Sequence, residues 1–348
     1  MSDGSADPGT WEDDRPIERL FDEIDALGRT NRAGRNPEIE RRVLRLRHLA
    51  GLRLIDKPVD ASAQSPSPAP DRLPSNANLP EVAPGELTPE VLRAAILRSG
   101  SLLVRGLVDT DEAARLADEI DRAYEAREAR ASGRPADGEY YTEFEPDPRF
   151  DLTNPRRFAG IGAGLWAADS PKVMLEVLDM FERTGLQRLA TGYLGERPAI
   201  SVHKCLLRKV TPDKFRDRAE GKGSSSGWHQ DGQFLGDVRA LNVWVSLSRC
   251  GDEAPGLDIV PRRIERIVPT GTDGASLDWT VSPTVVEEAA GDAGIVRPIF
   301  GRGDVLLFDE FFLHSTAVEP GMRNARYAVE CWFFRPSAFP SGYAPLAP

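Results

Sequence analysis

Two histidines and one aspartate in the second half of the chain have the residue types and the order of a metal site. His229 and Asp231 stand two residues apart in the segment Gly-Trp-His-Gln-Asp-Gly-Gln-Phe, residues 227–234. On a strand both side chains would point to the same face, because side chains alternate between faces. With a distant second histidine they would form a 2-His-1-carboxylate triad, which leaves coordination positions on Fe(II) open. We expect His314 to be that third ligand.

The other two histidines stand in different surroundings. His48 lies in an Arg-rich helical pattern and His203 in an apolar strand pattern. His229 and His314 both lie beside segments with strand character that could meet in a barrel. The sequence therefore predicts a metal-binding and catalytic centre made of one His-x-Asp pair and one remote histidine.

The order of His229, Asp231, a long insertion, His314 and Arg326 resembles that of the phytanoyl-CoA dioxygenase-like family of Fe(II)/2-oxoglutarate oxygenases. The resemblance covers residues from about 87 to about 340. Its most specific parts are residues 228–234, 242–246 and 308–334.

The resemblance implies that His229, Asp231 and His314 hold Fe(II), with 2-oxoglutarate as cosubstrate and O2 as oxidant. The implied reaction is hydroxylation of an aliphatic C–H bond of a small-molecule metabolite, with release of succinate and CO2. Halogenating relatives replace the carboxylate ligand with a small residue, so the retained Asp231 favours hydroxylation. The chain departs from the family at residues 261–263, where Pro-Arg-Arg replaces the usual start of Pro-Gly-Ser-His, so its substrate surroundings are expected to differ.

Four further residues are expected to contact the cosubstrate. Arg326 would hold the far carboxylate of 2-oxoglutarate, because a planar guanidinium matches a carboxylate in a bidentate pair. Thr316 would add a hydroxyl to the same carboxylate, while Asn242 and Trp244 would line the chelating end. Two alternatives stay open: Arg326 could pair with a barrel acid, and Arg323 could be the anchor instead.

Other classes of function share part of this residue set. A zinc hydrolase accepts the same ligands but has no use for Arg326. A 2-oxoglutarate-independent oxygenase or isomerase built on a similar metal barrel stays open, and so does a non-catalytic binding barrel.

The pattern around the triad predicts a barrel preceded by helices. Helical patterns begin at Thr88, at Asp109 and at 170–194, and strand patterns follow at 200–210 and 241–248. The last of these alternates apolar residues with Asn, Trp and Ser, as expected of a strand with one face toward a ligand cavity. We predict a mainly β fold with supporting helices, a double-stranded β-helix of the jelly-roll, cupin-like type.

The expected domain organisation has three parts. Residues 1–56 form a helical appendage with a disordered start, residues 57–86 a Pro/Ser-rich linker, and residues 87–348 the oxygenase domain. Every proposed ligand follows the linker, so residues 1–86 are expected to be dispensable for the chemistry. The Ser- and Gly-rich stretch 211–227 is a candidate lid.

Composition limits the kinds of partner. The 348 residues include 44 basic and 55 acidic ones, a net charge of -11, which argues against nucleic-acid or membrane binding. The polar start lacks the features of a secretory signal, so a cytoplasmic protein is expected. Three widely spaced cysteines suggest reduced, mostly buried thiols. A small-molecule substrate is the expected partner, and a homo-oligomer stays possible.

Overall fold

Two β-sheets form the centre of the structure, a computed structural model that describes residues 11, 13, 15–56, 64–74, 78–161, 164–215, 227–272 and 274–348. The large sheet has the strand order β1-β2-β7-β5-β9-β4-β10, with β3 paired to β4, and the small sheet pairs β6 with β8. The strands are β1 (Glu81–Val82), β2 (Ser101–Val104), β3 (Gly164–Trp166), β4 (Ala199–Val210), β5 (Ala240–Ser246), β6 (Gly256–Ile259), β7 (Val305–Phe308), β8 (His314–Ala317), β9 (Arg326–Phe334) and β10 (Pro345–Leu346).

The large sheet has two faces of different character. On its outer face, Val243 of β5 and Phe333 of β9 belong to a large apolar core that also includes helical side chains. On its inner face, Trp244 of β5 and Trp332 of β9 belong to a second core. This alternation along β5 is the one that its sequence predicts, because successive residues of a strand point to opposite faces.

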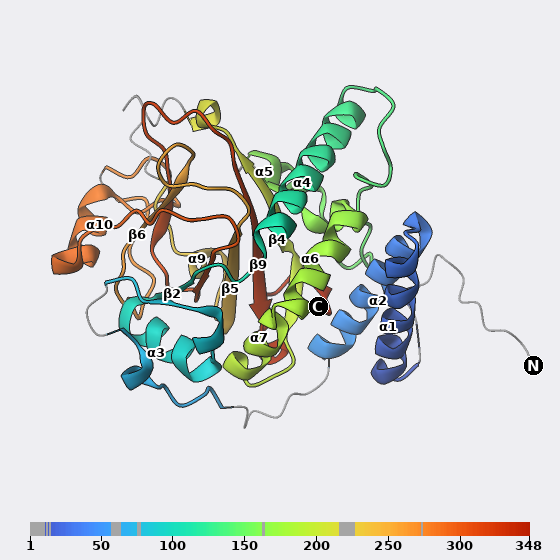
Figure 1. Ribbon diagram of the computed structural model, residues 1–348, viewed down its shortest axis with the longest axis horizontal. Coiled ribbons are helices and arrows are strands. Elements are labelled where there is room, and N and C mark those ends of the chain that lie inside the picture. The colour runs from blue at the N-terminus through green and yellow to red at the C-terminus, as the bar shows by residue number, and fades with distance from the viewer. Residues whose placement is uncertain are drawn as a thin grey trace, which may run out of the picture.

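Helices cover the outer face of the large sheet, and Figure 1 shows α4, α6 and α7 lying across it. Thr88 begins α3 by accepting a 3.3 Å hydrogen bond from the backbone N–H of Val91, the cap that the sequence predicts. Gly185, at φ 77°, separates α6 from α7, so the single helix expected at 170–194 is two. The helices after the N-terminal pair are α3 (Pro89–Ser99), α4 (Thr110–Ala131), α5 (Thr153–Ile161), α6 (Pro171–Arg183), α7 (Leu186–Leu194), α9 (Gly232–Leu235) and α10 (Pro283–Ala290).

The small sheet packs against the inner face of the large one. Leu257 and Ile259 of β6 share the inner core with Leu306 of β7. Two isolated bridges widen the small sheet, one between His229 and His314 and one between Ile259 and Val296. In order across the small sheet, the segments are therefore 229, β8, β6 and 296. The inner core lies between these two layers.

The N-terminal helices α1 (Ile17–Ala33) and α2 (Pro37–Asp56) lie side by side at one end of the molecule (Figure 1). α2 packs on α6 and on β10 near the end of the chain. Its Gly51 lies so close to β10 that an added Cβ would come within 2.9 Å of the backbone nitrogen of Leu346. Buried His48 donates from Nδ1 to the Pro345 carbonyl over 2.6 Å and accepts at Nε2 from the N–H of Asp147 over 3.0 Å. Residues 37–56 are thus part of the packed structure.

Three expectations about secondary structure need correction. Part of the predicted linker is ordered, since β1 pairs in parallel with β2 and Val82 lies in the outer core. The stretch between 266 and 300, for which the sequence predicts only short strands and loops, contains a helix, α10. Among the described residues helices hold more of the chain than strands do, so the protein is a mixed α and β structure rather than a mainly β one.

The cysteines and the apolar character of the helices were also considered from the sequence. Cys205, Cys250 and Cys331 are all buried and free, as the sequence predicts. In the described ranges, no helix combines the length and the apolar character that crossing a membrane requires.

Candidate metal centre

The triad is brought together by the small sheet and by the turn that follows it. The backbones of His229 and His314 exchange hydrogen bonds of 3.0 and 3.1 Å, which places the two histidines directly opposite each other. Asp231 does not lie on a strand, contrary to the geometry assumed above, but immediately precedes α9 with helical φ and ψ of -63° and -29°. The carboxylate reaches the histidines through this turn instead of through strand alternation.

Gln230 fixes the turn between the two ligands. Its buried side-chain amide donates to the carbonyls of Arg266 and Phe311 over 3.0 and 2.6 Å. Its carbonyl oxygen accepts from the N–H of Val268 over 2.7 Å. These bonds tie the His-x-Asp segment to two remote loops, and such contacts hold ligands in place before a metal binds.

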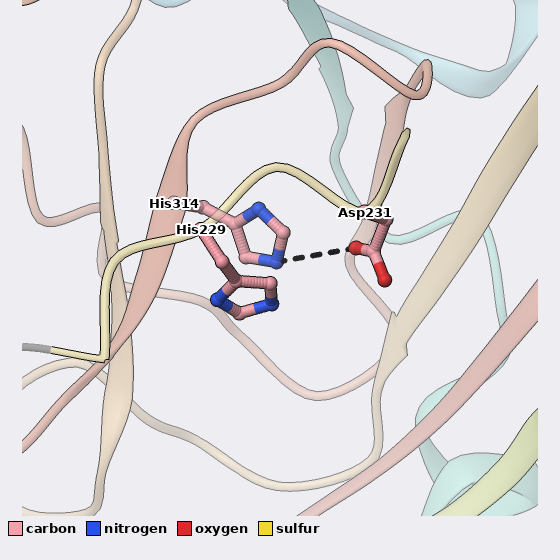
Figure 2. Close-up of side chains that lie close together, drawn as sticks. All are labelled: His229, Asp231 and His314. Carbon is pink, nitrogen blue, oxygen red and sulfur yellow. Dashed lines mark ion pairs between the residues drawn. The ribbon is translucent and has the colours of Figure 1, made fainter. Parts of the chain in front are cut away.

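The ligand atoms of His229, Asp231 and His314 all lie within 4.8 Å of one another, so these residues can hold one metal ion. Figure 2 shows both imidazole rings beside the Asp231 carboxylate, with His314 Nε2 at 3.8 Å from Asp231 Oδ2. Each Nδ1 is used elsewhere: that of His229 donates to the Gly227 carbonyl over 2.7 Å, and that of His314 to the Phe312 carbonyl over 3.1 Å. In the neutral form of each ring the lone pair therefore lies on Nε2, the form that a metal needs.

The surroundings of the triad favour the ionisation states of metal ligands. Burial, assisted by His314, lowers the pKa of His229 from 6.5 to about 4, so the imidazole is neutral at pH 7. Burial alone would raise the pKa of Asp231, but Lys204 and the two histidines outweigh it, and the carboxyl is held ionised. The neutral imidazole of His229, the Asp231 carboxylate and the second imidazole of His314 are a ligand set that suits a divalent cation.

Lys204 of β4 is a neighbour of the triad whose partner the sequence did not identify. Its Nζ donates to Asp231 Oδ1 over 2.7 Å, whereas Oδ2 is the oxygen nearer to His314. One carboxylate oxygen is thus occupied by the lysine and the other is left for a metal. Arg208 on the same strand pairs with Glu330 over 2.7 Å.

A row of buried polar atoms on the inner face of the large sheet lies beside the triad. Ser101, Phe308, Asn242 and Trp332 stand opposite one another on four adjacent strands. The Phe308 ring lies 5.1 Å from the His314 ring. Among the described residues, the hydroxyl of Ser101, both side-chain atoms of Asn242 and the indole nitrogen of Trp332 have no hydrogen-bond partner. Leaving such groups unpaired costs about 1–3 kcal/mol each, so a row of them calls for a ligand.

Arg326 is buried at the other end of the inner face. One of its nitrogens, Nη1, donates to the Gly256 carbonyl over 2.7 Å, and its guanidinium lies 5.7 Å from the Trp244 ring. Its Nε has no partner, and among the described residues no acid pairs with it, which removes the ion-pair alternative there. Burial lowers the pKa of Arg326 to about 10, so it stays charged at pH 7. Arg323, the rival anchor, is exposed.

The spacing between the triad and Arg326 follows from the small sheet. Gly256, which binds Arg326, stands opposite Ala317, three residues beyond His314 on β8. At about 3.3 Å per residue this is about 10 Å along the strand. Half-buried Thr316 lies between these points and, by alternation, on the same side of β8 as His314. The candidate lid at 211–227 lies largely outside the described residues.

No model of a known protein family matches the sequence, and no curated protein matches it. Solved structures align with it weakly. AviO1 from Streptomyces viridochromogenes Tue57 shares 16% identity over 72% of this chain and 96% of its own, with a TM-score of 0.42. The epimerase SnoN in complex with Fe3+, alpha ketoglutarate and nogalamycin RO shares 17% over 70% and 82%, with a TM-score of 0.41. EctD from S. alaskensis with 2-oxoglutarate and 5-hydroxyectoine shares 19% over 79% and 84%, with a TM-score of 0.40. Alignments at these values establish neither a family nor an activity, so the function has to be argued from the site.

Proposed function

We propose that the protein is an Fe(II)- and 2-oxoglutarate-dependent oxygenase that hydroxylates an aliphatic C–H bond of a small-molecule metabolite. The observation that carries the proposal is a convergent triad of His229, Asp231 and His314 at the small sheet, whose strand β6 also binds a buried arginine, Arg326, which has no acidic partner among the described residues. A metal site alone would not require a buried guanidinium at a distance. A cosubstrate that binds the metal with one end and carries a second carboxylate accounts for both.

The residues present fit that cosubstrate. The gap of about 10 Å between His314 and the position of Gly256 is comparable to the span of a five-carbon dicarboxylate that chelates a metal at one end. Arg326 offers Nε to the far carboxylate, and Thr316 offers a hydroxyl on the way. Asn242 and Trp244 lie on the inner face of β5, where Asn242 supplies unpartnered atoms near the triad.

Fe(II), 2-oxoglutarate and O2 together supply the oxidation when bound, with succinate and CO2 as products. The protein holds the metal ligands in fixed tautomers through Gly227 and Phe312, and keeps Asp231 ionised through Lys204. Phe308, Phe312 and Trp332 surround the site with aromatic rings and exclude water from it. Asp231 retains a carboxylate on the metal, which favours hydroxylation over halogenation.

We also propose a double-stranded β-helix and membership of the phytanoyl-CoA dioxygenase-like family. Support comes from the strand order. The large sheet contains β7-β5-β9-β4 and the small sheet contains 229, β8, β6 and 296. From β4 to β9 the chain changes sheet at every step except one, from β6 to 296, which are neighbours in the small sheet. This alternation is what a jelly roll requires.

The decisive experiment is anaerobic reconstitution with Fe(II), followed by titration of 2-oxoglutarate while the metal-to-ligand charge-transfer band is recorded. The wild-type protein should develop the band. His229→Ala and His314→Ala should not, because the metal loses a ligand. His203→Asn is a matched control, since His203 stacks on Tyr343 at 4.6 Å and is not part of the triad.

Three outcomes would contradict the proposal. Metal binding without a charge-transfer band would favour the rival metal enzymes, either a hydrolase or a 2-oxoglutarate-independent oxygenase or isomerase. Equal bands in the wild type and in His314→Ala would show that the cosubstrate complex forms elsewhere. Substrate-dependent turnover in a rigorously chelated sample would also exclude the mechanism.

A further inference from the structure

Large apolar side chains are exposed around the metal centre. The described residues include seven exposed large hydrophobic side chains, and four of them lie in the segments that border the triad. These four are Phe234, which is 42% exposed, Ile267 at 37%, Leu277 at 48% and Trp279 at 37%. Exposed apolar side chains that gather in one place mark a binding surface, whereas single ones need no explanation.

Two of these side chains are rings in contact with a metal ligand. The ring of Phe234 lies 6.3 Å from that of His229, and the ring of Trp279 lies 6.0 Å from it in an edge-to-face arrangement. The Phe234 and Trp279 rings lie 5.9 Å apart, also edge to face. Both rings therefore border the position at which a substrate would react.

Backbone bonds fix the two rings relative to the triad. The N–H of Phe234 donates to the Asp231 carbonyl over 2.9 Å within the turn that begins α9. The loop of Trp279 is attached by the N–H of Val281, which donates to the Trp228 carbonyl over 2.9 Å, next to His229. Ile267 borders the same turn, since a Cβ added to Gly232 would lie 2.9 Å from its Cδ1.

Lys204, a charged side chain close to Phe234, is already paired. Lys204 Nζ lies 5.8 Å from the centre of the Phe234 ring, but it already pairs with Asp231. The lysine is therefore occupied by a metal ligand, and beside the triad Phe234 and Trp279 offer a substrate two aromatic rings. Pairs of rings held edge to face accept a third flat ring by stacking on one and meeting the edge of the other.

We propose that Phe234 and Trp279 form an aromatic clamp that binds a flat, uncharged ring of the substrate beside the metal. They act as specificity-determining residues: the clamp holds the ring, and a C–H bond attached to or near it lies within reach of the metal. The identification of this ring as part of the substrate rests on the proposed function. The existence of the clamp does not.

The test uses the full-length, metal-free protein and the uncharged naphthalene dye prodan, whose emission shifts to the blue on entering an apolar site. The wild type should bind prodan saturably. Phe234→Ala and Trp279→Ala should each weaken binding at least ten-fold. Leu97→Ala and Ile299→Ala, at exposed apolar positions of α3 and of the loop before β7, are matched controls and should bind as the wild type does.

Conservative variants separate ring stacking from general apolar contact. Phe234→Tyr and Trp279→Phe keep a ring and should bind within three-fold of the wild type, whereas Phe234→Leu keeps the apolar volume and should not. Among the described residues Trp279 is the only tryptophan in the exposed class, so bound prodan should also protect its fluorescence in the wild type from quenching by acrylamide. All variants alter exposed side chains, and circular dichroism checks that they fold.

The position beside the metal is tested with Co(II) in place of iron. Prodan should shift the visible d–d band of the Co(II) protein in the wild type but not in Phe234→Ala. The inference is overturned if either alanine variant binds prodan normally, if Phe234→Leu does so, if the controls lose binding as well, or if bound dye leaves the Co(II) band unchanged.

These readouts need neither 2-oxoglutarate nor turnover. If prodan binds as expected but 2-oxoglutarate produces no charge-transfer band, the proposed oxygenase activity is refuted and the clamp is not. If the band appears but prodan does not bind as expected, only the clamp is refuted.

Discussion

The outer and inner faces of the large sheet are built from the same strands but carry opposite kinds of side chain. The outer face joins the helices in an apolar core, with Phe333 packed edge to face on Phe181 of α6 at 5.5 Å. Within the described strands of this sheet, every buried side-chain nitrogen or oxygen without a partner lies on the inner face. These atoms belong to Ser101, Asn242, Arg326 and Trp332.

The difference separates what the sheet does for stability from what it does for binding. Apolar packing on the outer face lowers the free energy of the folded chain without any ligand. Unpaired polar groups on the inner face raise it, and only a bound molecule can offset them. Burying such groups in a row lowers the stability of the folded chain, and a role in binding a ligand explains why they are present. Substitutions on the two faces should therefore act on different measurements.

The largest effect is expected on the outer face. Phe333→Ala should lower the free energy of unfolding by about 3–5 kcal/mol, because a fully buried ring is removed from a packed core. Urea unfolding of the metal-free protein measures this loss. At temperatures where the variant is folded, 2-oxoglutarate should bind its Fe(II) form with nearly wild-type affinity. A variant of unchanged stability that binds the cosubstrate poorly would reverse the roles of the two faces.

The second prediction contrasts a histidine on the helical side with those of the triad. Burial lowers the pKa of His48 to about 4 from 6.5 in the unfolded chain, and both its nitrogens are already bonded. Between these pH values the unfolded chain takes up a proton that the folded chain refuses. Stability is therefore complete above about pH 6.5 and falls as the pH drops toward 4, by up to about 3 kcal/mol from His48.

Urea unfolding at several pH values, with a chelator present, tests this dependence. His48→Gln should show a shallower loss of stability between pH 6.5 and 4 than the wild type, whatever its stability at pH 7. Parallel curves for the two proteins would mean that His48 is as easily protonated in the folded state as in the unfolded one.

The third prediction concerns the charged end of the inner face. Arg326→Ala should weaken 2-oxoglutarate by about 30-fold, about 2 kcal/mol, because the far carboxylate loses a buried charged partner. Fe(II) binding should change little, since Arg326 is not a ligand. Titration of 2-oxoglutarate into the anaerobic Fe(II) protein measures the affinity, with Arg323→Ala as the control at an exposed arginine. If Arg326→Ala binds 2-oxoglutarate with wild-type affinity and Arg323→Ala binds it much more weakly, Arg323 and not Arg326 holds the far carboxylate.

The sequence predicts the parts of the site that depend on residue type and on strand period. The triad could be predicted because few residue types bind metals, and the inner positions of β5 because side chains alternate along a strand. The turn at Asp231 could not be predicted, because it depends on bonds from Gln230 to Arg266 and Phe311, which are remote in the chain.

The N-terminal helices illustrate the same limit. The helical period predicts an apolar face on α2 but not the surface that this face covers. That surface is formed by α6 and β10, which lie more than a hundred residues further along the chain. Residues 1–86 contain no proposed ligand, and we predicted for this reason that the reaction does not need them. That expectation stays a prediction. Their removal would nevertheless uncover β10 and delete β1 from the sheet. A truncated chain that begins at residue 87 must therefore be shown to fold before a loss of its activity can be interpreted.

The smallest effect should reveal the cost of the inner face directly. Asn242 is fully buried and neither side-chain atom has a partner among the described residues. Asn242→Leu keeps a similar shape and removes both polar atoms, so it should stabilise the metal-free protein by about 1 kcal/mol. The same change should weaken 2-oxoglutarate, because the ligand loses the groups that Asn242 offers. Unfolding without ligands and the charge-transfer titration measure the two effects, which should have opposite signs. If Asn242→Leu is instead destabilised in the metal-free state, the amide is satisfied by the folded chain itself, and the inner face is not strained in the absence of its ligand.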